Sequence, residues 1–229
     1  MTPTRERGRA GNGGGAPGST AAVAPPPAVP GDPAAILLAA GAGSRFGAPK
    51  LLQPLDGVPL VRRSAERVLA GGASGLTVVL GSDAAAVRAA LRGLPARFVV
   101  NRHHAAGLAG SLRAGIRSLA PDAAGALIAL GDQPGVRPEV VVALLAAFRA
   151  GAAPIVAPEY RGFRGNPVVF HRSIFTELLR LRGDGGARDL LAADLGRVHL
   201  VPFELPPPDD VDTPDDYRRL HDAWPASGS

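Results

Sequence analysis

Residues 35–50 read AILLAAGAGSRFGAPK and join a short apolar run to a glycine-rich turn that ends at Lys50. An apolar run without polar alternation is typical of a strand in a parallel sheet that is covered on both faces. Gly41, Gly43 and Gly47 allow positive φ and let a ligand approach the backbone closely. The stretch therefore predicts a buried strand followed by a turn whose backbone N–H groups are able to bind an anion.

Outward from this stretch, apolar runs and helical patterns alternate along the chain. We predict strands over 35–39, 76–80, 98–100, 126–130, 155–157, 167–170 and 198–203. We predict helices over 59–70, 83–91, 110–119, 138–150, 173–181, 187–195 and 214–223. This order predicts an α/β fold with a doubly wound, mostly parallel sheet, in which ligands bind beyond the carboxyl ends of the strands.

The ends of the chain have a different composition from the middle. Residues 1–33 are rich in glycine and proline and show no apolar periodicity, so we expect a disordered tail there. Residues 34–224 carry the alternating pattern and are expected to form a single domain, while 225–229 are expected to be a frayed end.

Composition excludes several classes of function. The absence of cysteine excludes disulfides, thiolate metal sites and a cysteine nucleophile. The net charge is +5, but the arginines are scattered singly, which favours an ordinary solvated surface over a nucleic-acid interface. Without a membrane-spanning apolar run or a secretory signal, we expect a cytoplasmic protein with no membrane partner.

The turn after the first strand carries two cations, Arg45 and Lys50, and Lys50 is the only lysine in the chain. A guanidinium binds phosphate oxygens as a fork, and an ammonium supplies a compact charge, so the pair suits a polyphosphate. The spacing matches neither the Walker pattern nor G-x-G-x-x-G. The alternative is a plain tight turn.

Two carboxylates stand where predicted strands or loops end. Asp132 follows the strand over 126–130, and Asp212 precedes the last helix. The fold could bring both to one Mg²⁺, which prefers oxygen ligands. The alternatives are local: a turn or cap for Asp132, and helix capping at the last helix, where Thr213 is expected at the N-cap and Asp216 three residues later.

The segment after the strand over 98–100 offers polar groups to a heterocyclic ligand. Asn101 has both donors and an acceptor, Gly107 allows close approach, and Ser111 is able to cap the next helix. His103 and His104 have no third ligand at metal-site spacing, so we interpret them as loop histidines.

Taken together, six blocks resemble the MobA-like nucleotidyltransferases, and within them the molybdenum cofactor cytidylyltransferase branch. The blocks are LAAGAGSRFGAPKLLQPLDGVPLV, NRHHAAGLAGSLRAGI, ALIALGDQPGV, RGFRGNPVVF, GDGGARDLL and VDTPDDY, in this order along the chain. The resemblance implies a Rossmann-like fold of the nucleotide-diphospho-sugar transferase type. It also implies Mg²⁺-dependent transfer of CMP from CTP to the phosphate of molybdopterin or the molybdenum cofactor, with release of pyrophosphate.

The resemblance also assigns residues to the nucleotide. Lys50 and Arg45 would be catalytic; nucleotide-binding residues would be Leu38, Ala39, Ala40, Gly41, Gly43, Asn101, Gly107 and Ser111; Asp132 and Asp212 would hold magnesium. Ala40 is typical of the cytidylyl branch, whereas the guanylyl branch usually has glycine there.

On the acceptor side, the resemblance implies that Asn166, Asp184 and Arg188 meet a phosphorylated pterin. Asn166 departs from the branch, which commonly has histidine at that position. An apo-molybdoenzyme client is also implied. The alternatives are a guanylyltransferase, another NTP transferase acting on a different phosphorylated acceptor, and a non-catalytic carrier of a nucleotide cofactor.

Overall fold

The computed structural model describes Met1, residues 32–41 and residues 46–224. The expected N-terminal tail lies outside the described residues, apart from Met1 and residues 32–33, and Pro33 already belongs to the first strand. The expected frayed end at 225–229 also lies outside them.

The elements follow one another as the alternating pattern predicts. The strands are β1 (Pro33–Ala39), β2 (Pro54–Leu55), β3 (Val58–Pro59), β4 (Ser74–Leu80), β5 (Ala96–Val100), β6 (Gly125–Leu130), β7 (Ile155–Tyr160), β8 (Phe163–Arg164), β9 (Val168–His171) and β10 (Val198–Phe203). The α-helices are α1 (Leu60–Ala70), α2 (Ala84–Ala90), α3 (Leu108–Arg117), α4 (Pro138–Arg149), α5 (Phe175–Leu178), α6 (Arg188–Ala193) and α7 (Pro214–Ala223). Short 3₁₀ turns are η1 (Lys50–Leu52), η2 (His104–Ala106), η3 (Arg172–Ile174) and η4 (Leu195–Arg197).

The central sheet has the order β10-β7-β9-β6-β1-β4-β5, with β8 paired to β7. β1 pairs in parallel with both β4 and β6. The chain runs outward from β1 through β4 to β5 and then returns to the other side of β1 as β6. The carboxyl ends of β1 and β6 therefore flank the topological switch point, where open α/β sheets bind their ligands.

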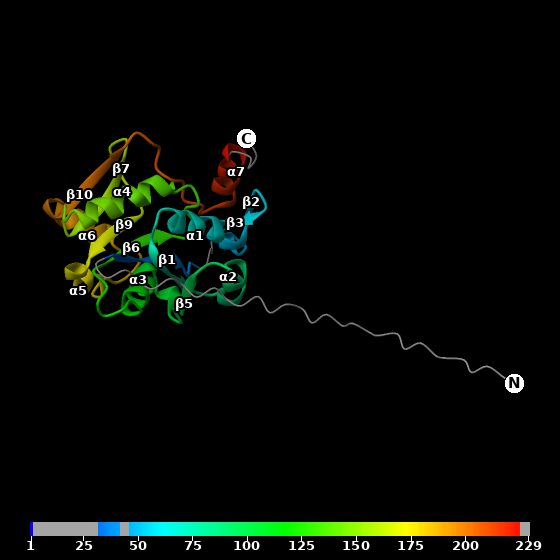
Figure 1. Cartoon of the computed structure of the whole chain (residues 1–229). Helices are drawn as coiled ribbons and strands as arrows, with labels where there is room; N and C mark the ends of the chain where they lie inside the picture. The colour runs from blue at the N-terminus through cyan, green and yellow to red at the C-terminus, as the bar shows by residue number, and fades with distance from the viewer. Residues whose placement is uncertain (2–31, 42–45, 225–229) are drawn as a thin grey trace.

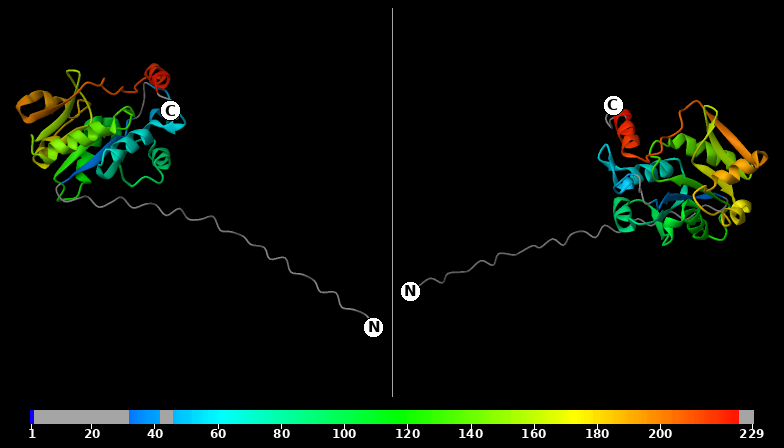
Figure 2. Two further views of the ribbon diagram at one scale, coloured as in Figure 1. Left: turned by 45° about the horizontal axis from the view of Figure 1, so that its top comes forward. Right: turned by 180° about the vertical axis from the view of Figure 1, so that it is seen from behind.

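Helices cover both faces of this sheet, as Figures 1 and 2 show. Along β1, Leu37 packs with the side chains of α1, α2 and α4, whereas Ile36 packs with those of α3 and α5. Two apolar cores thus enclose the sheet, and the predicted single α/β domain with a mostly parallel sheet is confirmed.

Some details differ from the sequence prediction. β9 is antiparallel to both β6 and β7. Only a short hairpin connection separates it from β7, and a parallel crossover needs a dozen or more residues. The helix expected over 173–181 is reduced to η3 and the short α5, because its last residues close in i→i−3 bonds, such as Arg180 N to Glu177 O at 3.0 Å.

A third, small apolar cluster fixes the last helix. Leu55, Leu60, Val211 and Leu220 pack together, and α7 therefore stands against β2 and β3 (Figure 2). The predicted capping box is present: Thr213 Oγ1 accepts from Asp216 N at 3.2 Å, and the Asp216 carboxylate accepts from Thr213 N at 2.7 Å.

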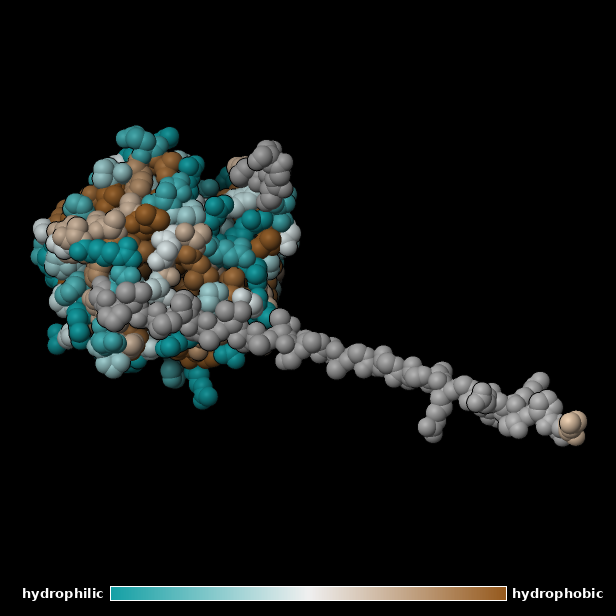
Figure 3. All heavy atoms as spheres, in the orientation of Figure 1, coloured by the Kyte–Doolittle hydropathy of each residue, from teal (hydrophilic) through white to brown (hydrophobic). Residues whose placement is uncertain are grey.

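The face of the molecule in Figure 3 mixes hydrophilic and hydrophobic residues without one continuous apolar area. Several arginines pair with neighbouring acids, for example Arg62 with Glu66 at 2.8 Å. Within residues 32–41 and 46–224, no helix is both long enough and apolar enough to cross a bilayer.

Candidate active site

Lys50 lies between two carboxylates at the carboxyl edge of the sheet. Its Nζ is 2.7 Å from Asp132 Oδ2 and 3.0 Å from Asp212 Oδ1. Lys50 is 8% exposed. Burial acts to lower the pKa of the ammonium, but the two carboxylates outweigh it and hold the pKa above its ordinary value. The lysine is therefore a fixed positive charge.

Local structure positions each of the three side chains. Lys50 opens the turn η1, whose backbone closes through Gln53 N to Lys50 O at 3.1 Å, and Leu51 anchors this turn in the core. Asp132 follows β6, where Gly131 N donates to Leu38 O at 2.9 Å. The bond joins the ends of β1 and β6, so the lysine and the first carboxylate share one edge.

The second carboxylate, Asp212, lies near the C-terminal end of the chain, just before α7. Val211 is 0% exposed, and its N–H donates to the carbonyl oxygen of Asp132 at 3.2 Å. Asp212 N in turn donates to the Asp216 carboxylate at 3.1 Å. These contacts set Asp212 beside Asp132. The alternative role of Asp132 as a cap is not observed, because α4 has Arg137 at its N-cap and no side-chain capping bond.

Sequence reasoning missed two members of this cluster, Gln133 and Asp210. Gln133 is 4% exposed, and its Nε2 donates to Asp210 Oδ1 at 2.7 Å. Loss of hydration and the negative charge of Asp132 raise the pKa of Asp210. One signal was available: Asp210, Val211 and Asp212 alternate polar, apolar and polar, as in an extended segment with one buried face.

The donor set suits a divalent cation. One carboxylate oxygen from each of Asp132 and Asp212 already converges on a single positive charge. Within the described ranges, no three histidine, cysteine or acidic side chains gather as a complete metal site. Mg²⁺ commonly binds through one or two carboxylates and completes its shell with water and substrate phosphates, so the two carboxylates fit that ion.

Of the residues expected to line the base pocket after β5, Asn101 and Gly107 lie in the loop before α3, and Ser111 lies in the first turn of α3. Asn101 Nδ2 donates to Ser111 Oγ at 3.1 Å, and Asn101 Oδ1 accepts from His103 N at 3.0 Å. Asn101 and Ser111 are buried, so their side chains brace this loop. Ala39 and Ala40 are buried at the end of β1, and the exposed Gly41 follows them.

The two other expected phosphate ligands, Gly43 and Arg45, lie outside the described residues.

Gly107 lies where the loop expected to bind the base meets the loop expected to bind the acceptor. Its φ is +97°, and a Cβ there would lie 2.5 Å from Asp184 Oδ1 and 2.6 Å from Gly183 O. Only glycine fits this close approach. The loop that carries Asp184 and leads to Arg188 at the start of α6 is thereby held against the start of α3, where Ala109 N donates to Gly183 O at 3.1 Å.

A cavity of about 540 Å³ opens beside this junction. The three residues expected to meet the acceptor all line it, namely Asn166, Asp184 and Arg188. Leu38 from β1 also lines it, as do Gln133 and Asp210 from the cluster around Lys50. The structure thus brings these three residues to one cavity, which also borders the charged cluster.

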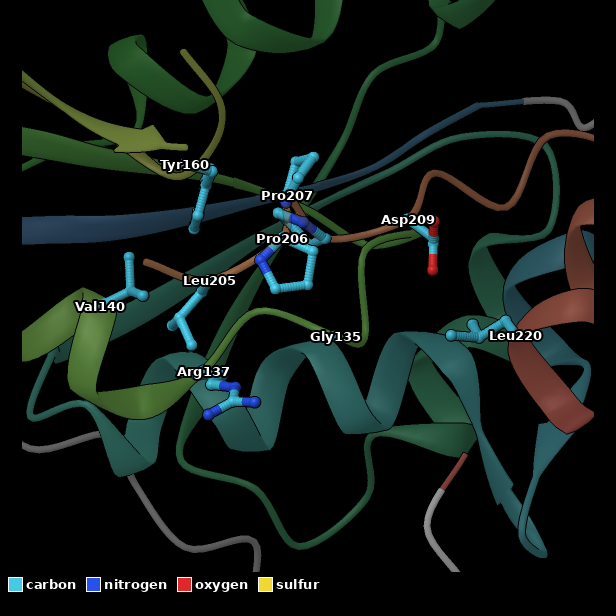
Figure 4. Close-up of a pocket in the computed structure, with 10 residues that line it drawn as sticks. Gly135, Arg137, Val140, Tyr160, Leu205, Pro206, Pro207, Asp209 and Leu220 are labelled. Atoms are coloured by element: carbon cyan, nitrogen blue, oxygen red, sulfur yellow. The ribbon is translucent and has the colours of Figure 1, made fainter. Parts of the chain in front are cut away.

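A smaller cavity of about 160 Å³ contains none of the residues expected to bind substrate. Figure 4 shows Val140, Leu205 and Arg137 around it. Pro207 and Pro208 border both cavities, but Asp209 lines only the small one and Asp210 only the large one. The extended proline segment therefore turns successive carboxylates to opposite sides.

A family model described as the MobA-like NTP transferase domain matches residues 35–198. The chain belongs to this family. The match covers the strands and loops that carry Lys50 and Asp132, and the MobA-like assignment agrees with the sequence resemblance.

Relatives of this MobA-like chain match more than 80% of its length. Nicotine blue oxidoreductase of Paenarthrobacter nicotinovorans is 36% identical over 200 residues, which cover 81% of this chain and 94% of that protein. The crystal structure of Rv0371c from Mycobacterium tuberculosis H37Rv is 33% identical with a TM-score of 0.77, covering 85% of this chain and 100% of that chain. A complex of Rv0371c with manganese is also similar, at 32% identity and a TM-score of 0.72, covering 84% and 98%.

A nucleotidyl transferase from Methanothermobacter thermautotroptrophicus is 26% identical with a TM-score of 0.71, covering 83% of this chain and 96% of that chain. The fold and the family are therefore those of nucleotidyltransferases.

Proposed function

We propose that the protein transfers CMP from CTP to the phosphate of a pterin acceptor of the molybdopterin type and releases pyrophosphate. The observation that carries the proposal is Lys50 between Asp132 and Asp212, at the switch point of the sheet and next to the acceptor cavity. The choice of CTP rests on Ala40, and the choice of a pterin rests on the sequence motifs.

The reaction is an in-line attack by an acceptor phosphate oxygen on the α-phosphorus of the nucleotide. The bond from the α-phosphorus to the bridging oxygen of pyrophosphate breaks as the new oxygen–phosphorus bond forms. The attacking oxygen is already ionised near neutral pH, so no side chain has to remove a proton. Positioning and charge neutralisation are then the main contributions of the protein.

The charged cluster supplies that neutralisation. Lys50 offers a positive charge whose position is fixed by its two carboxylates, so little reorganisation is needed when phosphates arrive. Asp132 and Asp212 would hold a magnesium ion, which adds positive charge next to the phosphates when bound. The manganese complex of the similar Rv0371c supports the choice of a divalent ion.

The acceptor residues have distinct tasks in this proposal. Arg188 would meet the acceptor at the rim of the cavity, and Asn166 and Asp184 would orient it. The Asn166 backbone is fixed because its carbonyl accepts from Tyr160 Oη at 2.8 Å.

Thermal unfolding with each of the four NTPs, with and without Mg²⁺, tests the nucleotide site. A ligand at a hundred times its dissociation constant adds about 2.7 kcal/mol to the free energy of unfolding. We expect a Mg²⁺-dependent stabilisation by CTP that is lost in Asp132→Ala. Asp209→Ala is the matched control, because Asp209 faces the other cavity and should leave the shift unchanged.

The other outcomes are informative. Stabilisation by GTP instead of CTP would move the protein to guanylyl transfer. Stabilisation by CTP without pyrophosphate release in a single turnover with acceptor would favour a carrier. Absence of stabilisation by any NTP would contradict the proposal.

A second candidate is reduction of a bound heterocycle, favoured by the 36% identity to nicotine blue oxidoreductase over 94% of that protein. The 540 Å³ cavity would then hold the ring that is reduced. The two candidates differ in products: transfer releases pyrophosphate, whereas reduction consumes a reductant such as NADH or NADPH, followed at 340 nm.

A further inference from the structure

Lys50 donates to the same pair of carboxylates that would hold a divalent cation. Its Nζ lies 2.7 Å from Asp132 Oδ2 and 3.0 Å from Asp212 Oδ1, and both are hydrogen-bond distances. A divalent cation bound by the same pair would have its charge close to the ammonium. Because like charges repel, each cation weakens the attraction of the two carboxylates for the other.

Solvent reaches the carboxylates more readily than the ammonium. The side chains of Asp132 and Asp212 are 23% and 40% exposed, whereas that of Lys50 is 9% exposed. A metal ion from solution is therefore able to reach the two carboxylates. A buried charge such as that of Lys50 is screened by salt much less than an exposed one. The repulsion between the ammonium and a bound metal ion therefore persists at ordinary salt concentrations.

The backbone keeps the ammonium beside the carboxylates. Lys50 is the first residue of η1, and the neighbouring Leu51 is 7% exposed within the larger core. The turn is closed by Gln53 N, which donates to Lys50 O at 3.1 Å. With its backbone anchored in this way and its Nζ bonded to two distant segments of the chain, Lys50 has little freedom to move aside for a second cation.

The charge balance of the cluster changes when a nucleotide arrives. Lys50 cancels the charge of one of its two carboxylate partners, so the three side chains attract a divalent ion less than the carboxylates alone would. A triphosphate brings several negative charges. Its oxygens also complete the shell of Mg²⁺, which commonly binds through one or two carboxylates and substrate phosphates. The nucleotide thus supplies the attraction that Lys50 removes.

We propose that Lys50 makes metal binding at Asp132 and Asp212 depend on the nucleotide, so that the metal enters with the triphosphate and does not bind tightly before it. Lys50 keeps its place beside the carboxylates throughout. The part played by the nucleotide rests on the proposed function. The effect of Lys50 on the metal alone rests on the contacts of the three side chains.

Titration of the full chain with Mn²⁺, without nucleotide, tests the effect of the lysine. The electron paramagnetic resonance signal of free Mn²⁺ measures how much of the ion is bound. We expect weak binding by wild type and binding about tenfold tighter or more by Lys50→Met, within the usual range of coupling between two sites. Arg137→Met is the matched control: it also removes one positive charge, but the side chain is 56% exposed and lines only the small cavity. Its affinity for Mn²⁺ should equal that of wild type.

Thermal unfolding of the same samples tests the dependence on nucleotide. Wild type should be stabilised by Mn²⁺ together with CTP and barely by Mn²⁺ alone, whereas Lys50→Met should be stabilised by Mn²⁺ alone. Lys50→Gln replaces Lys50→Met if the latter does not fold, because the amide lacks the charge but still offers N–H donors to the carboxylates.

Equal affinities of wild type and Lys50→Met for Mn²⁺ would overturn the proposal. Stabilisation of wild type by Mn²⁺ alone, as strong as by Mn²⁺ and CTP together, would overturn it without any variant. Tighter Mn²⁺ binding in Lys50→Met, found together with no stabilisation of wild type by any NTP, would support the effect of Lys50 on the metal and contradict nucleotidyl transfer.

Discussion

Lys50 forms ion pairs with two carboxylates through one compact ammonium group. An arginine would present a planar fork of donors, which suits a single carboxylate better than two converging ones. The ammonium has three donors, and Asp132 and Asp212 take up two directions at 2.7 and 3.0 Å. In the proposed reaction, a phosphate oxygen would therefore meet a cation that is already oriented and charged.

Lys50→Ala should lower the turnover number more than a hundredfold. The variant loses a preorganised charge at the reacting phosphates, which is worth about 3 kcal/mol of transition-state stabilisation. Release of pyrophosphate from CTP and acceptor measures the effect. Near-normal turnover in this variant would remove Lys50 from the reaction.

Gln133 is a buried residue whose side chain contacts the charged cluster but is only partly hydrogen-bonded. Its Nε2 bonds Asp210, while its buried Oε1 has no hydrogen-bond partner among the described residues. A buried carbonyl oxygen without a donor is destabilising. We therefore interpret the Gln133 amide as a group that orients Asp210 rather than one that adds to the stability of the fold.

In Gln133→Leu, we expect stability and activity to respond differently. The free energy of unfolding should change by less than about 1 kcal/mol, because removal of the unpartnered oxygen offsets the lost bond to Asp210. The rate of pyrophosphate release should fall about tenfold as Asp210 loses its fixed position. Urea unfolding and steady-state kinetics on one preparation test both, and an unchanged rate would show that Gln133 is only a packing residue.

At the scale of elements, the cap of α7 is the device that orients Asp212. The Asp216 carboxylate accepts hydrogen bonds from Thr213 N, Thr213 Oγ1 and Asp212 N, so one side chain both begins the helix and holds the backbone of the site. These bonds lower the pKa of Asp216 from its ordinary value of 3.8.

Thr213→Ala should lower the free energy of unfolding by about 1 kcal/mol, the typical cost of losing an N-cap hydroxyl. Urea unfolding measures the effect, and Thr213→Ser, which keeps the hydroxyl, is the control for the cap.

The pKa of Asp216 is depressed in the folded state. The contribution of Asp216 to stability is therefore present above its ordinary pKa and disappears as pH falls through the lowered folded value. Urea unfolding between pH 7 and pH 3 of wild type and Asp216→Asn should therefore show a stability difference that shrinks in acid. A stability difference between wild type and Asp216→Asn that grows in acid would contradict the argument.

Most of the helices and longer strands could be predicted from the sequence, because their signals lie within short stretches of the chain. Apolar runs such as that of β1 and the Thr213–Asp216 spacing carry their signal within a few residues. The strands β2, β3 and β8 span two residues each and were missed, because so short a strand has no periodicity to detect. The orientation of β9 follows from the tertiary pairing of the hairpin rather than from composition.

For the whole molecule, the sequence predicted several residues that lie together at the carboxyl edge of the sheet, but not how they touch one another. Lys50, Asp132 and Asp212 were each predicted, but as phosphate and metal ligands, and their mutual ion pairs depend on contacts across 82 and 162 residues. Gln133 and Asp210 were not singled out, since their hydrogen bond and their place at the cavity become visible only in three dimensions.

Val211 links the global fold to the site. It is fully buried in the small cluster with Leu55, Leu60 and Leu220 and bonds the backbone of Asp132. Val211→Ala removes two buried methyl groups and should lower the free energy of unfolding by about 2 kcal/mol. It should also weaken Mg²⁺-dependent stabilisation by CTP, because the packing of Val211 no longer holds the neighbouring Asp212 beside Asp132.

Val68→Ala is the matched control for this prediction. Val68 is equally buried, in the larger core on α1, and so should lower stability without affecting the response to CTP. Equal responses to CTP in the two variants would show that the C-terminal segment is not coupled to the nucleotide site.

The long reach of the Lys50 contacts has a consequence for the protein while it is being made. The second carboxylate lies 162 positions beyond the lysine, so a chain emerging from the ribosome has its glycine-rich turn long before it has Asp212. The charged cluster is completed only when the last helix has been synthesised and has docked. Under the proposed function, we therefore expect a nascent chain to turn over no nucleotide until that last step is complete.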